Sequence, residues 1–391
     1  MSSGDLSIDQ LCEGFDVPEF VRRFEHVPGG EVVFGVGAIS VVGEKARSLG
    51  ASRVLLVTDP GLRKVGHEER CLGYLRDAGL EVFVFDDVHE NPTTEDVDRC
   101  VAAAKGHDID LIVGLGGGSS MDTAKGCNFI LTNGGRMQDY WGVGKAGKPM
   151  LPLIVIPTTS GTGSECQSFA LIADAETHMK MACGDKKAAA AVAILDSELT
   201  LTLPRAVTAH TGIDAIAHAL ETAVCLKRNE TSLAYSRAAW HLLNAGIERV
   251  LESPGDLEAR ARMQLGAAFA GTAIENSMLG AAHSCANPLT AHFGTVHGEA
   301  VGVMLPAVIR FNAGDPAASE VYDSLGGAES LAARVRELTL RCGMMTGLAS
   351  IGVTDEVIGT LSAEAARQWT AQFNPRAAGE SEMASLYRAA L

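Results

Sequence analysis

The hydrophobic pattern of the first half of the chain alternates between two kinds of stretch. Short runs rich in valine, isoleucine and leucine predict buried parallel strands at 53–59, 80–87, 109–118 and 151–159. Amphipathic stretches predict helices at roughly 38–49, 66–78, 94–106 and 119–132. Because strand–helix–strand units close through right-handed crossovers, this half is predicted to form an open, doubly wound α/β sheet.

The pattern changes near Pro204, after which small and apolar residues recur at spacings of three and four. These spacings predict helices at 205–226, 230–252, 255–275, 277–292, 297–312, 327–345 and 354–370. The sequence therefore predicts two domains, an N-terminal α/β domain at 1–203 and an all-helical domain at 204–391. Residues 1–20 follow neither pattern and are expected to form an extension.

The composition narrows the class of protein. A formal net charge of −16 argues against nucleic acid or an anionic membrane surface as a partner. The acidic, polar N-terminus lacks the pattern of a secretory signal, and no apolar run reaches the roughly 18 residues of a membrane span. The nine cysteines occur singly, without the paired spacing of a metal or redox motif. These features favour a soluble cytoplasmic protein that binds small molecules.

A glycine-rich segment, GLGGGSSMDTAKG at 114–126, follows the third predicted strand and opens a helical pattern. Glycines allow backbone N–H groups to approach a diphosphate, and a helix N-terminus attracts negative charge. A tight strand–helix turn would use the same glycines. Because Ser119, Ser120 and Asp122 add polar groups to the segment, we favour a phosphate site for a dinucleotide.

Two further polar segments end predicted strands. TTSGTGSE at 158–165 offers hydroxyls and glycines that can hydrogen-bond a second part of a dinucleotide, although such clusters are also ordinary loops. Asp59 ends the strand at 53–59. A carboxylate there can accept from a ribose 2′-hydroxyl and repel a 2′-phosphate, which favours NAD over NADP. An Asp-Pro turn explains Asp59 equally well.

The second half of the chain carries residue types that bind metals. Asp214 and His218 lie four residues apart in a helical window and therefore share a face. His283 lies in a helix that must end before, or bend at, Pro288, and His297 begins the next helical pattern. A helix, a break and a second helix can return His283 and His297 to one point. One Asp with three His suits Fe(II) or Zn(II) with an open position. A capping Asp with buried structural histidines is the alternative.

Together these motifs resemble those of the iron-containing (group III) alcohol dehydrogenases. The matching segments are GGGSSMDTAK, PTTSGTGSE, DAIAH, H-x13-H-G and the C-terminal NPR, and the likeness runs from about residue 28 to the end. The resemblance implies a dinucleotide-binding α/β domain and a helical metal-binding domain, with the active site in the cleft between them. It also implies reversible hydride transfer between a small alcohol or aldehyde and NAD(H), with NADP less favoured, in a homodimer or larger homo-oligomer.

The resemblance assigns site residues position by position. It implies that the metal, Fe(II) or alternatively Zn(II), is held by Asp214, His218, His283 and His297. It implies that the cofactor is contacted by Asp59, Asn91, Gly116, Gly117, Gly118, Ser119, Asp122, Thr158, Thr159, Thr162 and Lys180.

Asn287 departs from the family pattern. Many relatives carry a second histidine four residues after the position of His283, where it is proposed to belong to a proton path. A carboxamide takes up no proton at neutral pH. The resemblance therefore implies either another proton route or a role for Asn287 in orienting substrate, and we expect Asn287 and His283 to act at the catalytic centre. His292 is expected to be structural.

Other activities of the same superfamily are alternatives, namely a hydroxyacid–oxoacid transhydrogenase, a maleylacetate reductase or a glycerol dehydrogenase. The short DAIAH and H-x13-H-G spacing favours the iron group. A catalytically silent binding protein is the alternative from a different class, and the complete sets of metal-binding and glycine-loop residues argue against it. The sequence does not name the substrate, although chain position suggests that Trp141, Phe169 and Cys285 shape its pocket.

Overall fold

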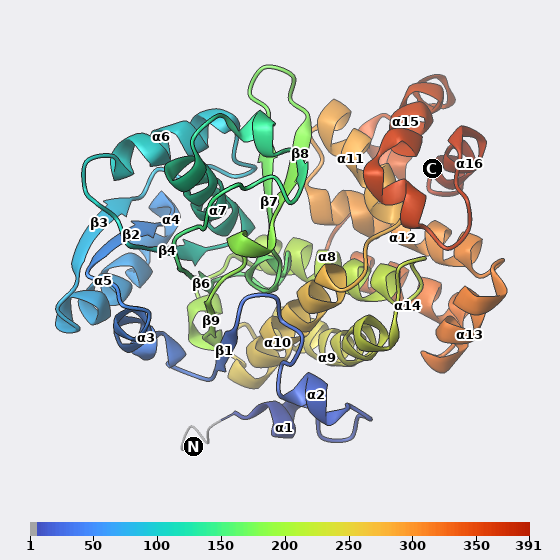
Figure 1. Ribbon diagram of the computed structural model, residues 1–391. Coiled ribbons are helices and arrows are strands. Elements are labelled where there is room, and N and C mark those ends of the chain that lie inside the picture. Colours follow the sequence, from blue (N-terminus) through green and yellow to red (C-terminus); the bar gives the residue numbers. More distant parts are fainter. Residues whose placement is uncertain (1–5) are drawn as a thin grey trace. The chain divides into compact units, whose positions relative to one another are not determined.

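The structure is a computed structural model that describes residues 6–391 and divides into two compact units (Figure 1). Residues 6–11 and 27–203 form an α/β unit, and residues 12–26 and 204–391 form a helical unit. Residues 1–5 of the expected extension lie outside the described residues. Within the described part, no helix is both long enough and apolar enough to cross a membrane.

The described residues of the α/β unit contain a six-stranded sheet in which every neighbouring pair is parallel. Across the sheet the strands are β1 (Glu31–Phe34), β9 (Val192–Leu195), β6 (Leu153–Pro157), β4 (Leu111–Gly116), β2 (Arg53–Val57) and β3 (Glu81–Phe85). The predicted doubly wound α/β class is confirmed. The pattern located β2, β3, β4 and β6, whereas β1 and β9 were not predicted because each has only four residues.

Helices cover both faces of this sheet, and the strand sequences show why. On β2, Val54 and Leu56 face one hydrophobic core, whereas Leu55 and Val57 face the other. The helices of this unit are α1 (Ile8–Leu11), α3 (Val42–Ser48), α4 (Pro60–Lys64), α5 (His67–Asp77), α6 (Thr94–Ala104) and α7 (Gly118–Asn133). Buried residues of α3 and α5 pack on the first face, and those of α6 and α7 pack on the second.

The strand order places a topological switch point beside β2. The chain runs from β2 outward to β3 and then returns to β4 on the other side of β2. Loops after neighbouring strands diverge at such a point, which is where open α/β sheets bind ligands. Asp59 follows β2 and Gly117 follows β4, so both lie at this edge of the sheet.

A second, smaller sheet extends the α/β unit. It contains β5 (Gly142–Val143), β8 (Lys180–Gly184) and β7 (Phe169–Ala173), in that order. β7 and β8 pair antiparallel, and the register sets Ala173 opposite Lys180. The sequence pattern did not predict this sheet, because its strands are short and only partly buried.

The helical unit is built from long helices with small residues at their contacts. Its helices are α2 (Glu19–Arg22), α8 (Arg205–Thr222), α9 (Glu230–Glu252), α10 (Leu257–Glu275), α11 (Ala281–Phe293), α12 (His297–Asn312), α13 (Pro316–Ser324), α14 (Ala328–Arg341), α15 (Asp355–Arg367) and α16 (Glu380–Ala389). A Cβ at Gly266 on α10 would lie 2.7 Å from Leu243 of α9, so the glycine is needed for this close packing. Helices α13 and α16 were not predicted.

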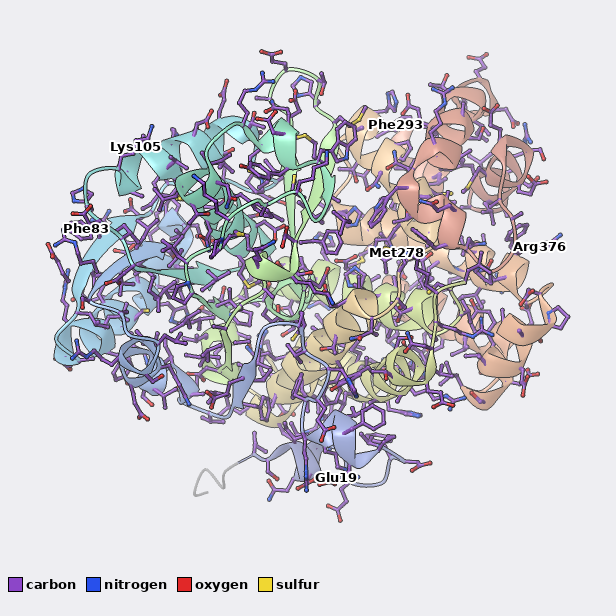
Figure 2. All side chains as sticks on the ribbon, in the orientation of Figure 1. Glu19, Phe83, Lys105, Met278, Phe293 and Arg376 are labelled. Atoms are coloured by element: carbon purple, nitrogen blue, oxygen red, sulfur yellow. The ribbon has the colours of Figure 1, made fainter. Side chains whose placement is uncertain are left out.

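Helix α11 continues through Pro288 to Phe293, whose side chain is labelled in Figure 2. Of the two outcomes expected at this proline, an end of the helix is therefore not observed. Proline removes one backbone donor from the helix. Cys285 and Leu289, on either side of the proline, are buried, and Tyr387 Oη donates a 2.7 Å hydrogen bond to the Cys285 carbonyl. The break comes instead at Gly294, whose φ is +63°.

Residues 12–26, which include the end of the extension expected at 1–20, are anchored in the helical unit. Phe24 is buried, and its ring centroid lies 4.8 Å from that of Phe269 on α10. The Tyr235 hydroxyl on α9 donates to the carbonyl of Glu25. Residues 12–26 therefore belong to the helical unit, although the sequence pattern placed them with the N-terminal domain.

Candidate metal centre and nucleotide pocket

Helix α8 carries three polar side chains on one buried face. Asp214, His218 and Glu221 are spaced four and three residues apart, so they follow one another along the same side of the helix. All three are at most 6% exposed. Buried ionisable groups are rare unless they are paired or bind an ion, so this face is a candidate site. Glu221 was not predicted, although its spacing from Asp214 and His218 could have revealed it.

The ends of α11 and α12 bring two further histidines to this face. His283 Nε2 lies 3.4 Å from Asp214 Oδ1, and His297 Nε2 lies 3.8 Å from the same atom. The start of α12 can approach α8 closely because residue 298 is glycine. A Cβ there would lie 2.0 Å from the carbonyl oxygen of His210.

The residues predicted to bind metal are thus brought together around one carboxylate oxygen. Asp214, His283 and His297 offer ligand atoms that all lie within 4.8 Å of one another. His218 Nε2 lies 3.5 Å from Asp214 Oδ1, and its ring stacks on that of His283 at a centroid distance of 4.8 Å.

Two atoms at the centre of this cluster fit a cation. Asp214 Oδ1 and His283 Nε2 are buried and form no hydrogen bond. An unpaired buried carboxylate oxygen is destabilising by itself, and coordination of a cation would satisfy it. The donor set of one carboxylate with imidazoles is typical of Fe(II) and Zn(II) sites. With neutral imidazoles, a divalent ion there would retain a net positive charge.

The electrostatics favour positive charge at the same place. Burial would raise the pKa of Asp214, but the surrounding His218, His283 and His297 hold it well below its usual range. Burial would lower the pKa of His283, but Glu221 and Asp214 raise it to about 9. Glu221 lies beside Nδ1 of the His283 ring, and Asp214 lies beside its Nε2.

Asn287 and His292 lie on the same helix as His283 but have other partners. Asn287 Nδ2 donates to Gln368 Oε1 at 3.0 Å, next to the end of α15. His292 is 2.8 Å from Glu364 through its Nε2, and both of these side chains are substantially exposed. His292 is therefore part of a surface ion pair, and Asn287 is part of an amide pair.

In the α/β unit, the glycine-rich loop joins β4 to α7. Gly116 has a φ of +149°, and a Cβ there would lie 2.3 Å from Ser120 Oγ. A Cβ at Gly118 would lie 2.8 Å from Thr162, so the helix start and the threonine-containing loop after β6 touch through a position without a side chain. The loop thus presents the N-terminus of a 16-residue helix, whose unpaired N–H groups and dipole attract anions.

A pocket beside this helix collects many of the predicted cofactor residues. Six predicted positions line it, namely Asn91, Gly118, Ser119, Asp122, Thr162 and Lys180. The lining also includes five positions that were not predicted to contact the cofactor, namely Pro92, Ser164, Gln167, Phe169 and Leu171. Asn91 has a φ of +54°, and its backbone N–H donates to Ser119 Oγ at 3.2 Å.

Asp122, in the lining of this pocket, is linked through Ser164 to Lys125, a buried lysine that sequence reasoning missed. Burial raises the pKa of Asp122, and the nearby Lys125 partly opposes this rise. Asp122 accepts from Ser164 Oγ at 2.7 Å. The Lys125 ammonium donates to the Ser164 carbonyl at 2.7 Å and to its hydroxyl at 2.8 Å. Lys125 lies three residues after Asp122 on α7, a spacing that the motif GGGSSMDTAK contains.

The other predicted cofactor residues lie outside this pocket lining. Asp59 caps α4, because its Oδ1 accepts from the N–H groups of Gly61 at 2.8 Å and Leu62 at 3.2 Å. The Thr158 N–H donates to the Gly116 carbonyl at 3.0 Å. A Cβ at Gly117 would lie 3.2 Å from Thr159. Thr158 and Thr159 therefore contact the glycine-rich loop, whereas Asp59 contacts the start of α4.

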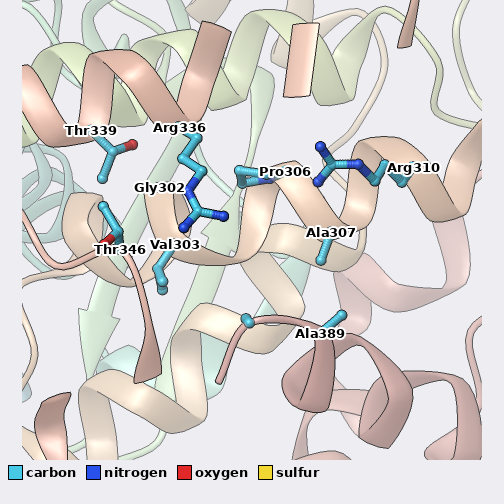
Figure 3. Close-up of a pocket in the computed structure, with 10 residues that line it drawn as sticks. Gly302, Val303, Pro306, Ala307, Arg310, Arg336, Thr339, Thr346 and Ala389 are labelled. Carbon is cyan, nitrogen blue, oxygen red and sulfur yellow. The ribbon is translucent and has the colours of Figure 1, made fainter. Parts of the chain in front are cut away.

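Of the residues suggested to shape a substrate pocket, Phe169 lines the pocket beside α7 and Trp141 is 48% exposed. Cys285 is fully buried and contacts Met383 Sδ at 3.5 Å, so it shapes no cavity described here. A different cavity in the helical unit lies between α12 and α14 (Figure 3). Its lining includes Arg310 and Arg336 but none of the predicted site residues.

The fold and the candidate sites define a class of protein. It has a doubly wound α/β unit with a glycine-rich loop after β4, and a helical unit in which a carboxylate and imidazoles suit a divalent metal. The family model for iron-containing alcohol dehydrogenase matches residues 29–197, and the model for the C-terminal part of the Fe-containing alcohol dehydrogenase family matches residues 208–391.

Individual relatives match over nearly the whole chain. Alcohol dehydrogenase 4 of Schizosaccharomyces pombe is 33% identical over 367 residues, covering 92% of this chain and 87% of the relative. The NAD-dependent methanol dehydrogenase of Bacillus methanolicus is 34% identical over 371 residues, covering 92% and 97%. The crystal structure of a 1,3-propanediol oxidoreductase superimposes with a TM-score of 0.88 at 32% identity, covering 93% of this chain and 98% of that one.

The chain belongs to the iron-containing alcohol dehydrogenase family. It is accordingly an oxidoreductase that acts on CH–OH groups.

Proposed function

We propose that the protein is a metal-dependent, NAD(H)-linked dehydrogenase that interconverts a small alcohol and its aldehyde. The observation that carries this proposal is the cluster around Asp214, where a buried carboxylate oxygen and a buried imidazole nitrogen face one another without a hydrogen bond. NAD is proposed as the cofactor, with support from the NAD-dependent methanol dehydrogenase among the relatives. Fe(II) is the proposed metal, and Zn(II) is the alternative.

The proposed ligands of the metal are Asp214, His218, His283 and His297. When bound, a divalent cation supplies Lewis acidity to an alcohol or carbonyl oxygen, and the nicotinamide supplies the hydride acceptor or donor. The chain itself supplies a donor set with a single negative charge, so the site keeps a positive potential toward an oxygen that becomes negative. Burial of Asp214 and His283 keeps water from competing with these electrostatic interactions.

The glycine-rich loop is proposed to bind the diphosphate of the cofactor. Gly116, Gly117 and Gly118 allow the backbone to approach, and the start of α7 offers the N–H groups of Gly118 and Ser119. The pocket side chains Asn91, Asp122 and Lys180 then surround the same end of the helix. Thr158, Thr159 and Thr162 are proposed to position the nicotinamide half, since they belong to the loop that contacts these glycines.

Asn287 is proposed to orient the substrate rather than to relay a proton, because a carboxamide does not titrate at neutral pH. Its hydrogen bond to Gln368 supports this role, since a side chain with a fixed amide group can present a defined partner to a hydroxyl. A cytoplasmic location and a homo-oligomeric state complete the proposal. The nine free, buried cysteines support a reducing compartment.

The test compares two histidine variants of anaerobically purified protein. His297→Ala removes a proposed ligand, whereas His292→Ala removes a surface histidine that pairs with Glu364. We expect wild type and His292→Ala to contain one divalent metal and to reduce NAD+ with a small alcohol. His297→Ala should lose most of the metal, and kcat should fall by about 100-fold or more, because Lewis-acid stabilisation is worth several kcal/mol.

Elemental analysis measures the metal, and NADH absorbance measures turnover with a panel of alcohols and aldehydes. Wild-type metal content and turnover in His297→Ala would show that the ligand assignment is wrong. Steady NADH release without an added oxo-acid distinguishes the dehydrogenase from a hydroxyacid–oxoacid transhydrogenase.

A further inference from the structure

Glu221 is a buried carboxylate with two separate partners on α11. Its Oε1 accepts from the Ala282 N–H at 2.7 Å, and its Oε2 lies 2.5 Å from His283 Nδ1. The residue is 3% exposed. Among the described residues, no lysine or arginine forms an ion pair with it. A buried carboxylate normally needs a nearby positive charge, so its charge must be balanced through the His283 side of the cluster.

Close approach of the two helices makes this double contact possible. Glu221 lies near the C-terminal end of α8, and α11 begins directly after Gly280. A Cβ at residue 280 would lie 3.1 Å from Glu221 Oε1 and 2.8 Å from Asn374 Oδ1. Glycine therefore leaves room for both acceptors at the first turn of α11.

These two acceptors satisfy different N–H groups of that turn. Asn374 Oδ1 accepts from the Ala281 N–H at 3.1 Å, while Glu221 accepts from the next one. The first N–H groups of a helix have no partner within the helix, so both residues support the same helix end. Only Glu221 also contacts a histidine.

The contact with His283 fixes which ring nitrogen faces the cluster. A neutral imidazole carries one N–H and one acceptor nitrogen, and the partner of one nitrogen selects the tautomer. With Nδ1–H donating to Glu221, the lone pair belongs to Nε2. That atom is buried, forms no hydrogen bond and lies 3.4 Å from Asp214 Oδ1. A carboxylate behind a metal-binding histidine orients the ring and strengthens the ligand.

We propose that Glu221 is a positioning residue for the metal centre, which holds His283 in the tautomer and orientation needed for a ligand. This inference rests on the proposed function, because it assumes that the cluster binds a divalent metal. Glu221 also supports the start of α11, so its two oxygens link the helix end and the ligand in one side chain. Among the described residues of the cluster, no other side chain contacts both the first turn of α11 and the His283 ring.

The variant Glu221→Gln separates these functions because a carboxamide has only one acceptor oxygen. Gln has the shape of Glu, but its NH2 group must face either the Ala282 N–H or the His283 Nδ1. If the oxygen serves Ala282, the NH2 donates to Nδ1 and the proton moves to Nε2, where it blocks the lone pair. If the oxygen serves His283, the Ala282 N–H loses its partner. Either arrangement disturbs the group that presents His283.

Asn374→Ala is the matched control. It removes the other hydrogen bond at the start of α11 without removing a contact to His283. It also removes the hydrogen bonds of Asn374 with Asn312 and with the Arg376 carbonyl, so any loss of stability in this variant is an upper bound for helix support. Both variants therefore weaken the helix end, but only Glu221→Gln alters the ligand. A role confined to helix support predicts equal effects on metal binding in the two variants.

Metal-free wild type, Glu221→Gln, Asn374→Ala and His297→Ala are titrated with Co²⁺ alone against a competing chelator. The Co²⁺ visible absorption spectrum is recorded, and thermal unfolding of the metal-free proteins is measured alongside. We expect Glu221→Gln to bind Co²⁺ about 10- to 100-fold more weakly than wild type, with a changed spectrum. Asn374→Ala should keep the wild-type spectrum and a Kd within about threefold of wild type, whatever its unfolding temperature.

The outcomes separate this inference from the proposed function. Absence of Co²⁺ binding by wild type would overturn the proposed metal site and the inference with it. Suppose that wild type binds Co²⁺ tightly and His297→Ala binds it weakly, so that the metal site is confirmed. Wild-type affinity and spectrum in Glu221→Gln would then overturn the role of Glu221 alone. Equal weakening in Glu221→Gln and Asn374→Ala would also overturn it, since helix support would then explain both.

Discussion

The Lys125 side chain bonds to several residues that line the pocket beside α7. Its side chain is fully buried on α7. Besides the carbonyl and hydroxyl of Ser164, its ammonium donates to the carbonyls of Gln167 and Phe169, each at 2.9 Å. All three of these residues line the pocket. One cation therefore ties the segment after β6 to the helix that carries the glycine-rich loop, and we predict that Lys125→Met loosens this segment.

The size of the effect follows from the groups that lose their donor. The carbonyl oxygens of Gln167 and Phe169 lose this donor, and at about 2 kcal/mol for each buried unsatisfied group the loss is roughly 4 kcal/mol. The Ser164 carbonyl still accepts from the Gln167 N–H at 3.2 Å. Methionine also removes the desolvation penalty of a buried ammonium, which is several kcal/mol. Ser164 Oγ keeps its bond to Asp122. The net expectation is a free energy of unfolding lower by about 1 kcal/mol.

The assay combines urea unfolding with NADH titration. Lys125→Met is compared with Lys105→Met, which changes an exposed lysine next to α6 (Figure 2). We expect the Kd for NADH to rise by about tenfold or more in Lys125→Met, equivalent to about 1.4 kcal/mol, while Lys105→Met stays near wild type. The metal content should be unchanged in both, because the proposed metal ligands lie on other helices. Wild-type NADH affinity and urea midpoint in Lys125→Met would refute the idea that this cation holds the segment.

Two further predictions concern the α/β unit. Burial would raise the pKa of Asp96, but hydrogen bonds with His89, Thr93 and Arg99 lower it from its usual 3.8 to about 2. The resulting stabilisation of about 2 kcal/mol is present above pH 4 and is lost as the pH falls toward 2. In urea unfolding, the free energy of unfolding of Asp96→Asn should therefore be lower than that of wild type by this amount at pH 7. The difference between the two proteins should become smaller below pH 4. A difference that does not depend on pH would contradict a stabilising role of the ionised Asp96. Asp59→Asn keeps an oxygen for the cap of α4 but removes the charge, so we expect the preference of kcat/KM for NAD+ over NADP+ to fall by about tenfold. An unchanged ratio of kcat/KM for NAD+ to that for NADP+ would show that Asp59 only caps α4.

The long, regular elements were predictable because one period runs through each of them. The apolar spacing located α9 at 230–252 and α12 at 297–312, which are also their observed bounds. Strand β9 was missed although all four of its residues are buried. Its neighbours decide its structure, since it pairs with β1, more than 150 residues earlier in the chain, and with β6. Four residues carry too little local pattern to reveal pairing over that distance.

In the candidate site, the residues proposed to bind the metal were predictable from the sequence, whereas the residues that hydrogen-bond to them were not. Asp214 and His218 were recognisable because both lie on one helix, and a motif can contain a fixed helical spacing. The partners of the buried charges were not recognisable in this way. Glu221 meets His283 across 62 residues, Lys125 meets Ser164 across 39, and Asn287 meets Gln368 across 81. A sequence window shows that a charge is present but not whether folding buries it.

The difference in predictability between proposed ligands and supporting residues has a physical cause. The same cause indicates where supporting residues can be found in relatives. A metal ligand or a phosphate loop must present particular atoms, so its residue types and local spacing are restricted. A supporting group must only satisfy an N–H, a carbonyl or a charge that folding has buried, and different side chains on distant elements can do so. Gly280 illustrates the link, because it carries no functional group yet leaves room for both Glu221 and Asn374 at the start of α11. Small residues beside predicted ligands therefore indicate where a buried supporting group enters the site.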